Sequence, residues 1–216
     1  MNQDEILTQQ IASIFFQHGT LKHFNAGQVL VEKGQPATQS CYVVRGQVRT
    51  FCMNPEGDIV TLFYVEENNL ICSESLLLDS LVNVSVQAIT PVDMYVMPGK
   101  EFLRLWEEHG YMIHKLFRPL ITRLTLLSDY ICCTHFREND KKVAYFLYSC
   151  YNRSGAVVRY SNEQIGDIIG INRVSVNRIL NIFAKKGILE LEYKKITILD
   201  AQRLSKVFNA VGYFID

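Results

Sequence analysis

Residues 161–187 read SNEQIGDIIGINRVSVNRILNIFAKKG, and this stretch decides how the carboxy-terminal third of the chain folds. Ser161 is a good N-cap and Gln164, three residues later, can complete a capping box, so we expect a helix to start here. Its buried face would be formed by three residues at helical spacing, Ile165, Ile168 and Ile169. Gly170 tolerates a positive φ and is expected to end this helix.

A second helix is expected directly after the first. Gly166 lies inside the first helix, where glycine costs about 1 kcal/mol relative to alanine. Close approach of a second helix at that point would explain its presence. Asn172 can cap this second helix. Its inward residues would be Val176, Ile179, Leu180 and Phe183.

The outward face of the second helix carries side chains that can contact DNA. It is formed by Arg173, Val174, Asn177, Arg178 and Asn181. In the major groove, arginine can donate two hydrogen bonds to guanine, asparagine can pair with adenine, and valine can pack on the thymine methyl group. The small residue inside the first helix and the turn after it also match the geometry of the DNA-binding helix-turn-helix motif. Together with this face, they predict that motif. Two helices that pack only for structure, with a solvated polar face, are the less favoured interpretation.

The charge distribution supports this prediction. The 216 residues suit one or two domains and carry no net charge. Residues 137–216 hold 13 Lys and Arg against 8 Asp and Glu, whereas residues 1–136 hold 9 against 14. The positive part of the chain is therefore the part with the helix-turn-helix.

The sequence predicts a cytoplasmic protein without a membrane partner. The acidic start MNQDE leads into no apolar run of signal-peptide length, and no stretch is long enough to cross a bilayer. The six cysteines show no Cys-x-x-Cys pair and no zinc-ligand spacing, so we expect core thiols and no metal site.

Short β-rich runs follow an amphipathic helix expected over residues 4–18. They are Val29–Val31, Cys41–Val44, Val48–Cys52, Ile59–Val65, Asn83–Ile89 and Asp93–Val96. Glycines separate several of them, as turn residues should. Short strands at this spacing predict a small antiparallel barrel or roll.

Residues 67–81 read ENNLICSESLLLDSL and interrupt the strand pattern. A compact excursion inside a barrel is a natural place for a ligand contact. Glu74 is its candidate carboxylate. A charge that only favours the local helix dipole is an equally weighted interpretation.

A long helix is expected over Tyr111–His135. Its apolar residues alternate spacings of four and three: Ile113, Phe117, Leu120, Leu124, Leu127, Ile131 and Thr134. This heptad seam predicts a two-stranded coiled coil and hence a homodimer, with Leu120, Leu124, Leu127 and Ile131 at the interface. A stripe that only covers the barrel is the alternative. Pro119 should kink the helix or delay its start.

A hinge and a wing complete the expected carboxy-terminal part. The polar residues HFREND (135–140) form the hinge, with Asn139 or Asp140 capping the next helix. After the helix-turn-helix, two short apolar runs flank Tyr193-Lys194-Lys195 and predict a β-hairpin. Its basic tip, with Lys194, would lie near DNA phosphates. A helix over about 201–210 closes the chain.

In this order of elements, the chain resembles the Crp/Fnr family of bacterial transcription regulators along nearly its whole length. YVVRGQV, within Gly27–Gly57, looks like part of the family's effector-binding β-roll, and IGDIIGINRVSVNRIL is similar to its DNA-binding signature. The resemblance implies an α+β protein with three parts. These are an N-terminal antiparallel β-roll of the cyclic-nucleotide-binding jelly-roll type (1–110), a dimerisation helix (111–136) and a winged helix-turn-helix (137–216).

The resemblance also implies roles for individual residues in a homodimer bound to a two-fold symmetric DNA site. Arg173, Val174 and Arg178 occupy base-reading and phosphate-contacting positions, and Ser161 falls where the family has a phosphate-contacting hydroxyl. Many members have Glu at the position of Val174, where the carboxylate accepts a hydrogen bond from cytosine. Valine cannot accept it, so we expect T or A at that base pair in each half-site.

Cyclic AMP is not the expected effector. Where members that bind it have Gly-Glu, Arg-Ser and Thr-Ser pairs, this chain has Ser73-Glu74, Val82-Asn83 and Leu127-Ser128. No cation lies between Asp79 and Val96 to neutralise a phosphate. The expected pocket is apolar, and its further lining residues are Phe63, Leu70, Cys72, Val84, Val86 and Arg123. It suits a small organic effector, either uncharged or an aromatic acid whose carboxylate meets Arg123, and no cofactor.

Other sensor types remain as alternatives. The iron–sulfur sensors of the family have a cluster of cysteines near the N-terminus, whereas the first cysteine here is Cys41, so this type is not expected. Haem would need a histidine such as His109 or His114. A thiol switch could use Cys132 and Cys133 across two subunits, although buried inert thiols are favoured.

No enzyme class fits the sequence. A metal-dependent barrel needs imidazoles, and residues 24–108 contain no histidine. A ligand-binding module whose winged helix contacts protein is the competing non-enzyme class. Glu56 and Asp58 form a charged turn that could contact RNA polymerase, but such turns are common on protein surfaces.

Overall fold

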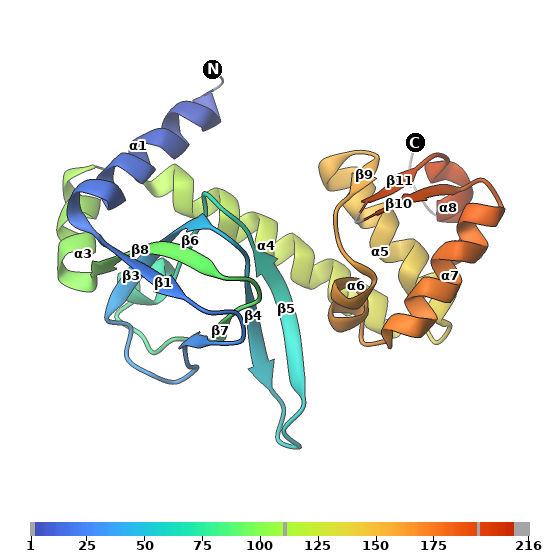
Figure 1. The fold of residues 1–216 in the computed structure, drawn as a ribbon, viewed down its shortest axis with the longest axis horizontal. Helices are drawn as coiled ribbons and strands as arrows, with labels where there is room; N and C mark the ends of the chain where they lie inside the picture. Colours follow the sequence, from blue (N-terminus) through green and yellow to red (C-terminus); the bar gives the residue numbers. More distant parts are fainter. Residues whose placement is uncertain (1–2, 110–111, 194, 210–216) are drawn as a thin grey trace. The chain divides into compact units, whose positions relative to one another are not determined.

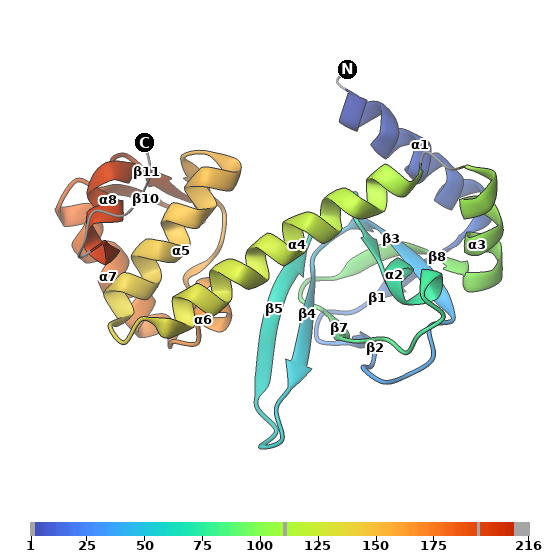
Figure 2. The ribbon, with the colours of Figure 1, turned by 180° about the vertical axis from the view of Figure 1, so that it is seen from behind.

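The computed structural model describes residues 3–109, 112–193 and 195–209. The chain forms two compact units, one ending at Leu124 and the other beginning at Thr125. The division falls inside α4 (Met112–His135), the long yellow-green helix in Figure 2. This single helix therefore contributes to both units.

The first unit contains two four-stranded antiparallel sheets that form a roll (Figure 1). Their strand orders are β1-β8-β3-β6 and β2-β7-β4-β5. The strands are β1 (Thr20–Phe24), β2 (Val29–Val31), β3 (Gln39–Arg45), β4 (Val48–Met53), β5 (Ile59–Val65), β6 (Leu70–Ile71), β7 (Ser85–Ala88) and β8 (Val92–Pro98). The helices of this unit, besides the first part of α4, are α1 (Gln3–His18), α2 (Ser73–Leu77) and α3 (Gly99–Glu108).

Helices α1 and α3 pack on the roll through an aromatic core. Phe15 of α1 is fully buried. Its ring centroid lies 5.7 Å from that of Tyr42 on β3 and 6.4 Å from that of Phe102 on α3. Burial of each such ring contributes about 1.5–3 kcal/mol. The amphipathic helix expected over residues 4–18 is confirmed as α1, and it packs against the roll.

The sequence pattern missed β1 and the short strand β6 of the excursion. β1 reads TLKHF, lies at the edge of its sheet against β8, and has four exposed residues in succession. An edge strand of this kind shows no alternation of apolar and polar residues. Within the excursion, β6 pairs two residues with β3 and leads directly into α2. These elements are too short to produce a periodic signal.

The turn between β3 and β4 requires glycine at position 46. Gly46 has φ +92°, and a Cβ there would lie 2.3 Å from the carbonyl oxygen of Pro91. Both the backbone conformation and the close approach exclude a side chain. Gly46 is thus the turn residue that its place between two β-rich runs predicts.

The second unit combines helices with a small antiparallel sheet of order β10-β11-β9. Its elements, besides the last part of α4, are α5 (Asn139–Ser154), β9 (Val157–Val158), α6 (Asn162–Ile169), α7 (Arg173–Lys185), β10 (Leu189–Glu192), β11 (Lys195–Ile198) and α8 (Ala201–Phe208). Its core contains Val143, Leu147, Ile165, Ile169, Leu180 and Leu204. The predicted fold class, a β-roll followed by helices and a winged helix-turn-helix, is confirmed.

One local expectation is wrong, and one part of another is excluded. Neither Asn139 nor Asp140 caps α5, because the helix starts at Asn139 and Glu138 takes the cap position without a side-chain cap bond. Glu138 instead pairs with Lys141 at 3.1 Å. Of the two effects expected of Pro119, a delayed helix start is excluded, because α4 begins at Met112 and contains Pro119. A kink at Pro119 stays a prediction.

Candidate nucleic-acid interface and effector site

The helix-turn-helix is fixed by local hydrogen bonds that its sequence predicts. At the start of α6, the backbone N–H of Gln164 donates to Ser161 Oγ (3.1 Å), and the N–H of Ser161 donates to Gln164 Oε1 (2.8 Å). At the start of α7, Asn172 Oδ1 accepts from the N–H of Ser175 (2.8 Å). The capping box and the second cap are therefore confirmed. Ser161 Oγ keeps its hydrogen to donate, as a phosphate contact would need.

Gly166 is needed because the turn between the two helices lies against it. A Cβ at this position would be 2.5 Å from the carbonyl oxygen of Ile171. The N–H of Ile171 donates to the carbonyl of Gly166 (3.0 Å), which fixes this approach. Gly170, with φ +69°, ends α6 in the left-handed region as predicted.

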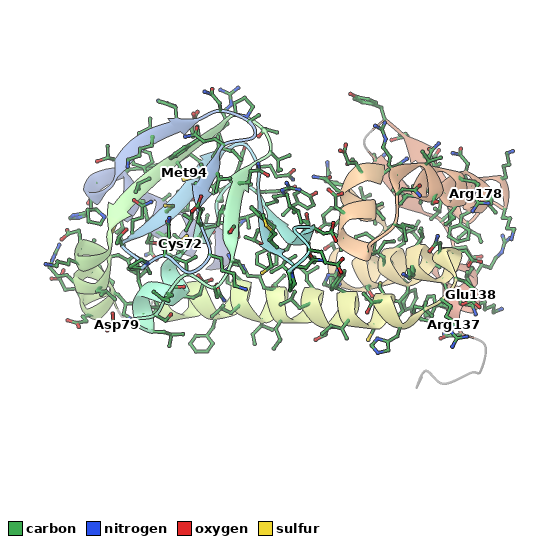
Figure 3. The ribbon with its side chains drawn as sticks, turned by 90° about the horizontal axis from the view of Figure 1, so that it is seen from below. Cys72, Asp79, Met94, Arg137, Glu138 and Arg178 are labelled. Atoms are coloured by element: carbon green, nitrogen blue, oxygen red, sulfur yellow. The ribbon has the colours of Figure 1, made fainter. Side chains whose placement is uncertain are left out.

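The predicted base-reading side chains lie on one exposed face of α7. Arg173, Val174, Asn177 and Arg178 are all exposed, and Val174 exposes 76% of its surface. Arg178 is labelled in Figure 3. Asn177 is linked by its amide to Asn162 of α6 and Asn181 of α7, a contact that the sequence analysis did not foresee. The inward residues predicted for α7 are buried.

The wing is formed by β10 and β11, which pair antiparallel from Leu189 opposite Ile198 to Glu192 opposite Lys195. Lys195 pairs with Glu192 at 2.6 Å. Tyr193 is 89% exposed at the tip. Lys194, the predicted phosphate contact, lies outside the described residues.

In the first unit, Arg123 joins three of the predicted effector-binding residues. Its guanidinium forms an ion pair with Glu74, donates to the carbonyl of Leu70 (2.9 Å) and lies over the ring of Phe63 (5.3 Å to the centroid). The Arg123 and Glu74 side chains are only 17% and 25% exposed. Because 49 residues separate Arg123 from Glu74, no local pattern indicated this pairing.

Cys72 and Ser73 lie beside this ion pair, at the start of α2. Cys72, labelled in Figure 3, has φ +66°. Burial, aided by the Glu74 carboxylate, raises the pKa of the Cys72 thiol to about 12. Ser73 is fully buried, and its Oγ lies 2.6 Å from Ser40 Oγ. The Ser73 hydroxyl is thus engaged inside the protein.

The other predicted pocket residues divide between the two units. Val86 of β7 is buried beside Thr50, which in turn pairs with Phe63. Val84, just before β7, is half-buried. Leu127 and Ser128 lie beyond Leu124, in the second unit. Their contribution to an effector site stays a prediction.

The predicted dimer seam follows exposed positions along α4. Phe117, Leu120, Leu124 and Ile131 are all exposed, and Leu127 is half-buried. The seam residue Ile113 lies outside the residues whose side chains are described. Near the end of α4, Asp129 forms an ion pair with Arg153 of α5. Both residues of this ion pair belong to the second unit.

The residues of the alternative sensors are not brought together into a metal site. Within the described ranges, no three His, Cys, Asp or Glu side chains could hold a metal ion. His109 ends α3, and the side chain of His114 lies outside the described part. Cys132 is exposed, whereas Cys133 is buried and burial raises the pKa of its thiol to about 12. Of the two thiols, only Cys132 is accessible in the single chain.

Comparison with known proteins identifies both units. Residues 21–109 match the model of the cyclic nucleotide-binding domain, and residues 141–207 match the Crp-like helix-turn-helix domain. Together they define a DNA-binding transcription regulator with an effector-binding domain. The chain belongs to the Crp/Fnr family.

Relatives share this arrangement over most of their length. The global nitrogen regulator of Nostoc sp. is 23% identical over 94% of this chain and 99% of its own. The cAMP-activated global transcriptional regulator CRP of Salmonella typhimurium is 21% identical over 85% of this chain and 91% of its own. Among solved structures, FixK2 from Bradyrhizobium japonicum has a TM-score of 0.70 and 19% identity, covering 89% of this chain and 98% of that one. In the described part of this chain, no helix is long and apolar enough to cross a membrane.

Proposed function

We propose that the chain acts as a homodimer that binds a two-fold symmetric operator and responds to a small organic effector other than cyclic AMP. The observation that carries this proposal is the outward face of α7, where Arg173, Val174 and Arg178 are exposed on a capped helix. In a dimer, two such helices would enter successive major grooves about 34 Å apart.

The exposed seam on α4 supports the dimer. Leu120, Leu124 and Ile131 recur at the spacing of a coiled coil, and each is exposed in the single chain. A second copy of α4 would bury these side chains, and each fully buried leucine or isoleucine contributes about 1.5–3 kcal/mol. The second copy is therefore the partner that the seam fits.

Arg178→Ala is expected to weaken binding to the selected operator by about 1–3 kcal/mol, because a base-contacting guanidinium is lost. Fluorescence anisotropy with a labelled duplex would measure the change. Arg45→Ala, at an exposed arginine of the first unit, is the matched control and should bind like the wild type.

The same titration separates a DNA regulator from a protein-contact module. Binding should weaken steeply with added salt, because Lys and Arg release counterions from the phosphates. A chain that binds no duplex, even at low salt, would refute the regulator proposal and favour protein contact by the winged helix.

The Glu74–Arg123 pair supports an effector without a phosphate group. The Arg123 guanidinium is already paired with the Glu74 carboxylate, donates to the Leu70 carbonyl and lies over the ring of Phe63. A second carboxylate at Arg123 would meet the negative charge of Glu74, so an uncharged, largely apolar molecule fits better than an aromatic acid. An RNA polymerase contact through Glu56 and Asp58, at the turn between β4 and β5, stays a prediction.

In a thermal-shift assay, cyclic AMP is expected to leave the melting temperature of the wild type unchanged. Glu74→Gln removes the internal counter-charge, so the variant should be stabilised by aromatic acids such as benzoate or phenylacetate more than the wild type is. Glu56→Gln, at an exposed turn, is the control. Clear stabilisation of the wild type by cyclic AMP would contradict the proposed effector class.

A further inference from the structure

Three asparagine side chains are linked on the face that would meet DNA. Asn162 is the first residue of α6, and Asn177 and Asn181 lie one turn apart on α7. Asn162 Nδ2 donates to Asn177 Oδ1 (3.1 Å), and Asn181 Nδ2 lies 3.3 Å from the same oxygen. Asn181 Nδ2 also donates to the backbone carbonyl of Asn177 (2.8 Å). We name these three residues the amide cluster.

The backbone carbonyl fixes the orientation of the whole amide cluster. A carbonyl only accepts hydrogen bonds, so Asn181 must turn its Nδ2 toward Asn177. The Asn177 atom facing that Nδ2 must then be the acceptor Oδ1. Asn162 approaches the same Oδ1 and must also present its Nδ2. A flipped Asn177 amide would place its own NH2 group against two other NH2 groups.

This orientation leaves Asn177 with donors only. An amide oxygen has two lone pairs, and both are directed to Asn162 and Asn181. Within the described part of the chain, Nδ2 of Asn177 donates to no acceptor, and the side chain is exposed. Pairing with adenine through two bonds requires the oxygen to accept from N6 while Nδ2 donates to N7. The first of these bonds is unavailable, which revises the adenine contact expected from sequence.

We propose that Asn177 reads its base pair as a hydrogen-bond donor alone and so selects guanine or thymine over adenine, with Asn162 and Asn181 as positioning residues. Guanine presents O6 and N7, and thymine presents O4, as acceptors in the major groove. Adenine places its N6 donor where Asn177 offers no acceptor. This specificity rests on the proposed binding of duplex DNA by the exposed face of α7.

Binding selection from a pool of randomised duplexes, with the full chain, tests the proposal. Asn177→Ala should erase base preference at one position in each half-site, which identifies the base pair concerned. The wild type should prefer guanine or thymine there. The double variant Asn162→Ala/Asn181→Ala frees Oδ1, so its affinity for adenine relative to guanine or thymine at that position should rise about 5- to 150-fold. Asn152→Ala, at an exposed position of α5, should leave the preference unchanged.

Three outcomes would overturn the proposal. The wild type could require adenine at the position that Asn177→Ala identifies. The double variant could lose affinity equally for all base pairs, which would mean that the amide cluster only holds α6 against α7. Selection of no duplex at all would refute the proposed DNA binding as well, whereas the first two outcomes leave it standing. Melting temperatures close to that of the wild type would show that each variant is folded.

Discussion

Replacing Leu124 by glutamate is expected to make the protein monomeric and to weaken its binding to a two-fold symmetric operator by about 10²- to 10⁴-fold. Leu124 is 61% exposed in the single chain, so a carboxylate there costs the folded monomer little. In a coiled coil the same position is buried against its counterpart, and two unpaired carboxylates would meet in an apolar seam. Loss of the linkage between two DNA-binding units removes the avidity that a symmetric site provides.

Sedimentation equilibrium and operator titration on the same preparation would measure both effects. Thr122→Glu is the matched control, since Thr122 is also exposed on α4 but lies about 200° around the helix from Leu124. The control should remain dimeric. A dimeric Leu124→Glu protein with wild-type affinity would show that the seam on α4 is not the subunit interface.

Gly166→Ala is expected to destabilise the second unit by about 3 kcal/mol, although alanine is the better helix former by about 1 kcal/mol. The added methyl carbon would stand 2.5 Å from the carbonyl oxygen of Ile171. That oxygen belongs to backbone held by the hydrogen bond from Ile171 N–H to Gly166, so the turn between α6 and α7 must shift. Operator affinity should fall further, because the shift re-aims the recognition helix.

Urea denaturation followed by circular dichroism would measure the change in the free energy of unfolding, and an operator titration would measure the change in affinity. Glu163→Ala, on an exposed position of the same helix, controls for the change in helix propensity. A Gly166→Ala protein as stable as the wild type, or more stable, would show that the close approach of the turn does not constrain this position.

The features that could be predicted from the sequence are those specified by residues close together in the chain. The capping box at Ser161, the cap at Asn172 and the turn at Gly46 each follow from a few neighbouring residues, and all are confirmed. The exposed face of α7 followed from the 3.6-residue periodicity of its apolar residues. Its outward residues are therefore placed as expected.

The features that could not be predicted depend on contacts between distant segments. The pairing of Glu74 with Arg123 joins an excursion of the roll to a helix 49 residues later. The sequence analysis therefore assigned Arg123 to an effector carboxylate, whereas the structure pairs it with a carboxylate of the protein itself. The amide cluster likewise depends on how α6 approaches α7. The edge strand β1 was missed because its exposed side chains lack alternation.

The division between the two units lies within an uninterrupted helix and not in a loop. Leu124, the last residue of the first unit, and Thr125, the first residue of the second, are neighbours in α4. A glycine substituted near position 125 would weaken α4 at this division without changing a residue of either predicted site.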